Sequence, residues 1–158
     1  MTGIRAIAAI SAGLSFVLGL MIERILMPVK ANAVLIPGLL DFTQVWNQGV
    51  SFGLFRQDAN MGRYVLIGVL AVVIIGVSIL AWRATNRLMA AAYGLIVGGA
   101  LGNLLDRSLH GAVFDYLFLH LGTAPLFVCN FPDIAISAGV LLLIGESFLT
   151  KEARPAGS

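Results

Sequence analysis

The chain has 158 residues, of which 59% are hydrophobic and 11% are charged, with a formal net charge of +2. Soluble domains carry roughly 25% charged residues, so these charges are too few to cover a water-facing surface, and we expect most of the outside to face lipid. The small net charge, without a basic run, argues against a nucleic-acid partner, and the single cysteine excludes an internal disulfide.

Four apolar stretches are candidate membrane spans. They cover residues 6–22, 64–82, 88–105 and 134–149. Each has 16 to 19 residues, close to the roughly 20 that an α-helix needs to cross a bilayer core about 30 Å thick, and we expect the first and last to gain a turn from their flanks. The sequence therefore predicts an all-α membrane protein, a four-helix transmembrane bundle in one domain of residues 1–150, followed by a polar cytoplasmic tail of residues 151–158.

The first stretch has a second interpretation as a cleaved signal peptide. Arg5 precedes it, and Ala31-Asn32-Ala33 resembles a cleavage site. Its apolar core is longer than the usual 7–15 or so residues of a signal peptide, and Glu23, Arg24 and Pro28 separate it from the candidate site. We therefore expect this stretch to be retained as the first membrane helix.

Four spans place both termini on the same side of the membrane. Basic residues favour the cytoplasmic side. Arg83 and Arg87 lie in the very short link between the second and third stretches, while Arg5 and Lys151 flank the first and the last. The two sides carry five basic residues each, so their total does not decide the orientation. Because the short link has a high density of basic residues, we expect that link and both termini in the cytoplasm.

The two connections on the opposite, outer side are long. Residues 31–57 mix apolar and β-branched residues with glycine and proline, a pattern typical of short strands joined by turns. We expect them to form a small β-cradle that lies on the membrane at the outer (periplasmic or extracytoplasmic) face. Residues 107–132 form the second long connection.

The third stretch has glycines at four-residue spacing, at Gly94, Gly98 and Gly102. Small residues at this spacing let helix backbones approach closely in lipid. The end of the stretch presents Asn103, Asp106 and Arg107 on one helical face. Asp106 and Arg107 form either an ion pair that ends the helix or a contact for a substrate, and the sequence leaves both possibilities open.

Three of the eight acidic residues lie in or beside the second connection, at Asp106, Asp115 and Asp133. An ionisable side chain at the edge of hydrocarbon is costly to keep and is a candidate functional residue. The apolar neighbours of Asp115 disfavour its charged form, although it could instead be a turn residue bound to a backbone N–H. Asp133 follows Asn130 by three residues, the pattern of a helix start, which favours the ionised form. Two carboxyls whose pKa values are pushed apart can act as acid and base.

Other chemistries find less support. His110, His120 and Cys129 match no known metal-ligand spacing, and we interpret the histidines as interfacial, so no metal and no cofactor is predicted. Glu146, near the inner end of the fourth stretch, is interpreted as snorkelling to the interface. The main alternative to an enzyme is a small transporter or a proton or cation relay that uses the intramembrane carboxylates, although no inverted repeat is visible.

Four blocks of the sequence resemble one known family. They are WNQGVSF (46–52), GGALGNLLDR (98–107), GAVFDY (111–116) and NFPDIAI (130–136). Their order, spacing and positions relative to the apolar stretches are similar to those of the type II (lipoprotein) signal peptidases, which are aspartyl peptidases with four spans. Each block alone is weakly specific, whereas the four together are highly specific and cover nearly the whole chain.

The resemblance implies that Asp115 and Asp133 are the catalytic aspartates and that the substrate is a prolipoprotein, cut just before a cysteine that carries diacylglycerol. It also implies an active site toward the outer leaflet of the bacterial cytoplasmic membrane, contact with membrane lipid, no metal or cofactor, and sensitivity to globomycin-type inhibitors. Six further positions are implied to shape the site: Asn47, Gly49, Asn103, Asp106, Arg107 and Asn130.

The chain departs from the family in two places. Where the family has a DQxxK-like element at the end of the first span, this chain has Glu23-Arg24-Ile25-Leu26-Met27. Glu23 keeps the negative charge and is assigned to the site, whereas the lysine has no equivalent. Pro132 replaces the usual alanine, and proline is tolerated near a helix start.

Overall fold

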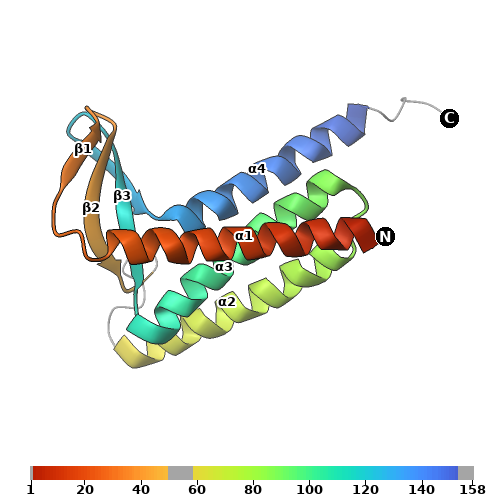
Figure 1. Cartoon of the computed structure of the whole chain (residues 1–158), viewed down its shortest axis with the longest axis horizontal. Helices are drawn as coiled ribbons and strands as arrows, with labels where there is room; N and C mark the ends of the chain where they lie inside the picture. Colours follow the sequence, from red (N-terminus) through yellow and green to blue (C-terminus); the bar gives the residue numbers. More distant parts are fainter. Residues whose placement is uncertain (1, 50–58, 153–158) are drawn as a thin grey trace.

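The computed structural model describes residues 2–49 and 59–152. Its four helices are α1 (Thr2–Leu26), α2 (Ala59–Trp82), α3 (Arg87–His110) and α4 (Phe131–Glu152) (Figure 1). All four are long and apolar enough to cross a membrane, which confirms the predicted four-span bundle. Each helix is longer than its predicted span, because helical hydrogen bonding continues through flanking residues beyond the apolar run.

Four membrane spans require the start of the first helix and the end of the last to lie on the same side, and the structure has this arrangement. α1 begins, and α4 ends, at the end of the bundle that lies opposite the sheet, and the α2–α3 link lies at that end too (Figure 1). Helix α4 continues through Glu152, so the first two residues of the expected polar tail, Lys151 and Glu152, are helical. Residues 153–158 of that tail lie outside the described residues.

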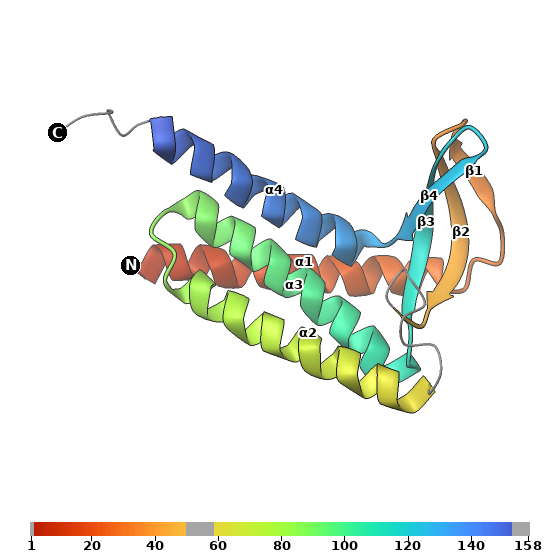
Figure 2. The same cartoon turned by 180° about the vertical axis from the view of Figure 1, so that it is seen from behind.

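Helix α3 is the centre of the bundle. It packs against α1, α4 and α2 (Figure 2), whereas α1 makes only slight contact with α2 and with α4. Over its membrane-spanning window, 56% of α3 is buried, compared with 11–17% for the other three helices. The three outer helices carry many exposed valine, leucine and isoleucine side chains, as expected for surfaces that face lipid rather than water.

Glycines bring the outer helices close to α3. A Cβ atom added at Gly98 would lie 2.3 Å from the carbonyl oxygen of Ala12 on α1, and one added at Gly99 would lie 2.5 Å from the carbonyl oxygen of Pro132 on α4. Real Cβ atoms do not approach backbone oxygen so closely, so these contacts require glycine. The predicted close approach of helix backbones is confirmed.

Replacing Gly98 with alanine is expected to destabilise the bundle. The new methyl group must push α1 away from α3, and overpacking of this kind costs about 1–3 kcal/mol. Gly76→Ala on α2 is the matched control, because nothing lies within 4 Å of a Cβ atom added there and alanine favours helix by about 1 kcal/mol over glycine. Thermal unfolding in detergent should show a lower midpoint for Gly98→Ala and no loss for Gly76→Ala. Equal midpoints would contradict the packing argument.

A four-stranded antiparallel sheet stands at one end of the bundle (Figure 1). Its strands are β1 (Ala33–Ile36), β2 (Leu40–Asn47), β3 (Val113–Leu121) and β4 (Ala124–Cys129), in the order β1-β2-β3-β4. The strands expected within residues 31–57 are thus present as β1 and β2, while residues 50–57 of that segment lie outside the described residues. The second connection supplies β3 and β4, which the sequence pattern did not predict.

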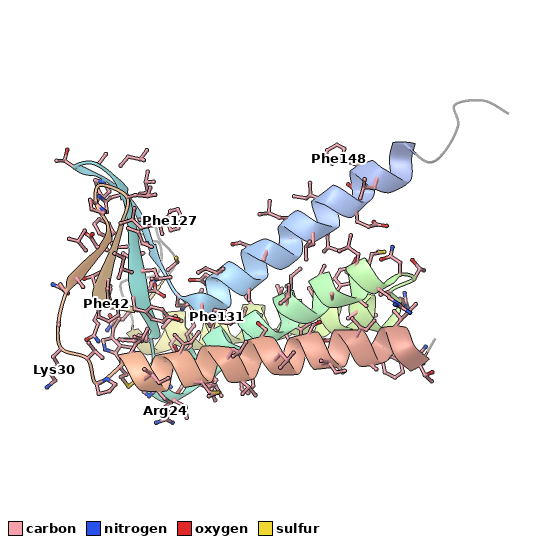
Figure 3. All side chains as sticks on the ribbon, turned by 45° about the horizontal axis from the view of Figure 1, so that its top comes forward. Arg24, Lys30, Phe42, Phe127, Phe131 and Phe148 are labelled. Carbon is pink, nitrogen blue, oxygen red and sulfur yellow. The ribbon has the colours of Figure 1, made fainter. Side chains whose placement is uncertain are left out.

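Aromatic packing joins the sheet to the helices. Phe42, Phe114 and Tyr116 form a buried cluster, against which Ile22 of α1 and Phe131 of α4 pack. Figure 3 shows Phe42 on β2 and Phe131 at the start of α4. Because this cluster includes both neighbours of residue 115 on β3, it fixes that part of the strand relative to the start of α4.

Candidate functional site

The two aspartates singled out by sequence come from different elements. Asp115 lies in β3, opposite Val45 of β2, and its side chain is buried, with 1% exposure. Asp133 lies in the first turn of α4 and is half-buried. The interpretation of Asp115 as a turn residue is wrong, because it sits within a strand and its carboxylate binds side chains rather than a backbone N–H.

Two amide side chains hold the Asp115 carboxylate. Asn130 donates from Nδ2 to Oδ1 at 2.9 Å, and Asn47 donates from Nδ2 to Oδ2 at 3.0 Å. Burial raises the pKa of Asp115 to about 6; the nearby Asp133 charge acts in the same direction, and the hydrogen bond from Asn47 opposes the shift. Desolvation disfavours the charged form of a carboxyl, so Asp115 keeps its proton to a higher pH than an ordinary aspartic acid.

Asp133 takes part in the start of α4. The Asp133 backbone N–H donates to Asn130 Oδ1 at 2.9 Å, and the Asn130 backbone N–H donates in return to Asp133 Oδ2 at 3.3 Å. This reciprocal pair satisfies backbone groups that a helix start leaves free, and it confirms the predicted helix start. The other oxygen, Oδ1, accepts from Asn103 Nδ2 at 2.7 Å. Asp133 therefore has a structural role and a place in the site at once.

One hydrogen-bond network connects the two carboxylates. Besides its bond to Asp115, Asn130 Nδ2 donates to Asn103 Oδ1 at 3.1 Å, and Asn103 donates to Asp133. The path from Asp115 through Asn130 and Asn103 to Asp133 thus contains only side chains. Each donor uses one lone pair of an oxygen, and a carboxylate has about four, so both groups retain capacity for a water molecule or a substrate.

Asn47 and Gly49 form the edge of the site on the β2 side. The backbone N–H of Gly49 donates to Asn47 Oδ1 at 3.2 Å, which directs the Asn47 amide nitrogen toward Asp115. Both residues were assigned to the site from the resemblance, and the structure brings them to it. The later residues of that block, 50–52, lie outside the described residues.

Asp106 and Arg107 each form a hydrogen bond with a backbone group rather than with each other. Asp106 is buried and accepts at Oδ2 from the backbone N–H of Phe114 at 3.1 Å, while Arg107 donates from Nη1 to the carbonyl oxygen of Asn103 at 3.3 Å. No ion pair joins the two within residues 2–49 and 59–152, so that interpretation is wrong. The Arg107 charge favours ionisation of Asp115, and Asp106 holds the residue that precedes Asp115 in the strand.

Glu23 brings α1 into the site. Ligand atoms of Glu23, Asp106 and His110 lie within 4.8 Å of one another, so these side chains are the part of the described chain that could share a metal ion. This group could not be predicted from spacing along the chain, because Glu23 comes from α1 and the other two residues from α3. His120 and Cys129 do not belong to it: His120 is buried in the sheet, 3.2 Å from Asp41.

Tyr116 is a site residue that sequence reasoning missed. Its side chain is buried, and its hydroxyl oxygen accepts from the backbone N–H of Phe131 at 2.9 Å. Burial raises the pKa of Tyr116 to about 12, so the hydroxyl stays neutral. It ties β3, which carries Asp115, to the start of α4, which carries Asp133. The available signal was a tyrosine beside a candidate aspartate in an otherwise apolar run.

Comparison with known proteins finds relatives that match most of the chain. Residues 8–149 match the family described as Signal peptidase (SPase) II. A lipoprotein signal peptidase of Methylorubrum extorquens (strain PA1) is 49% identical over 116 residues, which is 73% of this chain and 68% of that protein. One from Caulobacter vibrioides is 40% identical over 148 residues, which is 93% of this chain and 87% of that protein.

The fold also has a solved counterpart. A bacterial membrane enzyme determined by the in meso method at 2.3 Å resolution superposes with a TM-score of 0.74 at 20% sequence identity. The match covers 96% of this chain and 93% of that one. At this identity the likeness concerns the fold, a four-helix membrane bundle with a small antiparallel sheet.

Proposed function

The chain belongs to the signal peptidase II family, membrane proteases that process the signal peptides of lipoproteins, and on this premise we propose that Asp115 and Asp133 are its catalytic dyad. The observation that carries the proposal is the network in which Asn130 and Asn103 connect the two carboxylates. Two carboxyls in unlike surroundings, one buried and one at a helix start, can divide the roles of acid and base.

The proposed reaction is an aspartic-type hydrolysis without a covalent intermediate. Ionised Asp133 takes a proton from a water molecule between the carboxyls, while protonated Asp115 donates its proton to the oxygen of the scissile carbonyl. The water oxygen bonds to the carbonyl carbon. The carbon–nitrogen bond then breaks as the amine leaving group receives the proton from Asp133, and Asp115 recovers its own proton from the intermediate's hydroxyl, which restores the starting state.

The other assigned residues position the dyad or the substrate. Asn47, supported by the backbone N–H of Gly49, and Asn130 hold Asp115. Asn103 holds Asp133. The carboxylates of Glu23 and Asp106 lie beside one another, and Asp106 acts on the strand next to Asp115. In this proposal Arg107 supplies the positive charge near the scissile carbonyl, and no step passes through a metal or cofactor.

The proposed substrate is a prolipoprotein whose cysteine carries diacylglycerol. The site lies where apolar helices meet the sheet, and β1 and β4 expose large apolar side chains, among them Val34, Leu35, Leu126 and Phe127; Figure 3 labels Phe127. Such side chains can rest on a membrane surface. Acyl chains can then stay in lipid beside the helices while the peptide bond before the cysteine reaches the dyad.

The proposed location is the bacterial cytoplasmic membrane, with both termini in the cytoplasm and the site at the outer leaflet. Support comes from Arg83 and Arg87, which are exposed. They follow the end of α2 and begin α3, and the α2–α3 link lies at the end of the bundle opposite the sheet (Figure 1). A short, dense basic link favours the cytoplasmic side. Cysteine labelling of the 83–87 link in intact and in permeabilised cells tests this orientation.

Release of a signal peptide tests the proposed function. The purified protein is incubated with a prolipoprotein bearing diacylglyceryl cysteine and with the same precursor lacking the lipid. We expect cleavage before the cysteine in the lipidated precursor, little cleavage in the other, and inhibition by globomycin. Ion flux in proteoliposomes without peptide release would instead favour the transporter interpretation.

The pH profile should report the protonation of Asp115. Since Asp115 acts as the acid and its pKa is raised to about 6, its protonated fraction falls as pH rises through 6, and kcat/KM should fall with it, about tenfold per pH unit on the upper limb. Asn47→Ala removes the hydrogen bond that lowers this pKa, so it should move the upper limb to higher pH. A kcat/KM that is flat between pH 5 and pH 8 in both proteins would refute the assignment of Asp115 as acid.

A further inference from the structure

A groove lies between α1, α2 and α3, near the end of the bundle that is opposite the sheet. It has a volume of about 180 Å³ and is lined largely by small side chains, which include Ala8, Ala9, Ala12, Ala81 and Gly94. Helices α1 and α2 both pack on α3 but touch each other only slightly, so the small residues leave space between them. None of the residues that line the groove belongs to the candidate site.

Arg5 and Trp82 stand together at the groove. The central carbon of the Arg5 guanidinium lies 4.1 Å from the centroid of the Trp82 ring, and both residues line the groove. Stacking on an aromatic ring occupies the face of a guanidinium and leaves its N–H edge for oxygen acceptors. Tryptophan is enriched where membrane meets water, so this pair marks the level of the lipid headgroups.

The charges around this end of the bundle favour an anion. Arg83 and Arg87 are exposed in and beside the α2–α3 link, and Arg5 lies near the start of α1; the link and the start of α1 are at the same end of the bundle (Figure 1). Two acidic residues of α4 lie toward this end: Glu146 accepts a hydrogen bond from Asn86 at 2.8 Å, and Glu152 ends the helix next to the basic Lys151. Basic pockets between membrane helices bind anionic lipid headgroups.

We propose that the groove binds one anionic phospholipid, with its phosphate on Arg5 and part of one acyl chain against the alanines of α1 and α2. The helices span a membrane, so lipid is the medium that meets an opening between them. The size fits this occupant: an apolar cavity of about 150 Å³ takes up a benzene molecule, whereas sites for drug-sized ligands begin near 300 Å³. A short length of one chain therefore fills the space.

Native mass spectrometry of the purified protein tests the proposal. The probes are phosphatidylglycerol and phosphatidylcholine with identical acyl chains. Arg5→Gln removes the charge at the groove, and Ala9→Leu fills the groove from a position whose side chain is exposed. The matched control is Arg24→Gln, the same change on the same helix at the sheet end, where Figure 3 shows Arg24.

We expect the unaltered protein to retain phosphatidylglycerol in preference to phosphatidylcholine. Arg5→Gln should weaken phosphatidylglycerol retention about fivefold, the effect of one basic side chain near an anionic lipid surface, while Arg24→Gln should leave it unchanged. Ala9→Leu should weaken retention of the lipid without removing a charge. All three variants should still release signal peptides, which shows that they fold.

Three results would overturn the proposal. The first is equal retention of the two lipids by the unaltered protein. The second is an equal loss of phosphatidylglycerol retention in Arg5→Gln and Arg24→Gln, since this would show that retention depends on the total charge of the protein and not on the groove. The third is full retention by a folded Ala9→Leu variant, and if that variant fails to fold, the comparison of the two arginines decides the question.

Discussion

Asp115→Asn and Asp133→Asn should each lower kcat/KM for prolipoprotein cleavage by about 10²–10⁴-fold, the usual contribution of one general acid or base. Asparagine keeps the size of the side chain but cannot exchange a proton. Asp115→Asn removes the proposed acid, and Asp133→Asn removes the proposed base. Single-turnover cleavage of a lipidated precursor measures both losses, and detergent gel filtration shows whether each variant stays folded.

Asp41→Asn is the matched control for this pair. Asp41 lies on β2, where it pairs with Phe118 and contacts His120 rather than the dyad. Its replacement removes one carboxylate from the sheet, and kcat/KM for cleavage should stay within a few-fold of the value for the unaltered enzyme. Cleavage at the normal rate by either dyad variant would remove that aspartate from the mechanism.

Changes at Asn130 should separate helix capping from catalysis. Asn130 caps α4 through Oδ1 and holds Asp115 and Asn103 through Nδ2. Asn130→Ala removes the cap of α4, which costs about 1 kcal/mol of stability. It also removes one hydrogen-bond donor from the buried Asp115 carboxylate, which costs about 1–3 kcal/mol more. We expect a lower unfolding midpoint and a loss of activity of at least 100-fold. Asn130→Asp keeps the cap but replaces the donor to Asp115 with a carboxyl oxygen. It should therefore be inactive although α4 stays capped, and repulsion between the two buried carboxyls should lower its unfolding midpoint as well.

Asn86→Ala controls for the loss of a helix cap. Asn86 caps α3 by accepting from the Met89 backbone N–H at 2.8 Å, and it lies at the end of the bundle away from the sheet. This variant should be destabilised yet active. If Asn130→Asp cleaved precursors at the normal rate, Asn130 would be a cap and nothing more.

Hydropathy was sufficient to predict the four spans, because each must satisfy its backbone within one helix and present apolar side chains to lipid. The glycine spacing in 94–102 also predicted close packing of α3, though not its partners, since spacing alone does not show that Gly98 meets α1 and Gly99 meets α4. The start of α4 was predicted from Asn130 to Asp133, because capping is local in sequence.

Strands β3 and β4 could not be predicted in the same way. The first four residues of β3 are all buried, so the alternation that marks a half-exposed strand is absent. Its partner β2 lies some seventy positions earlier in the chain. The network of Asn47, Asn103 and Asn130 likewise joins residues that are far apart in the sequence. It is formed by three elements that only the tertiary fold brings together, so the resemblance could assign these residues to the site but not show what they hold.

The double variant Asp115→Asn/Asp133→Asn tests most directly whether the two aspartates act as one unit. Groups that serve a single step lose their effect together, so losses do not add. Measured in single turnover beside the two single variants, the double variant should be no slower than the slower of them. A double variant whose loss equals the product of the two single losses would show that Asp115 and Asp133 contribute independently, and would contradict a shared water between them.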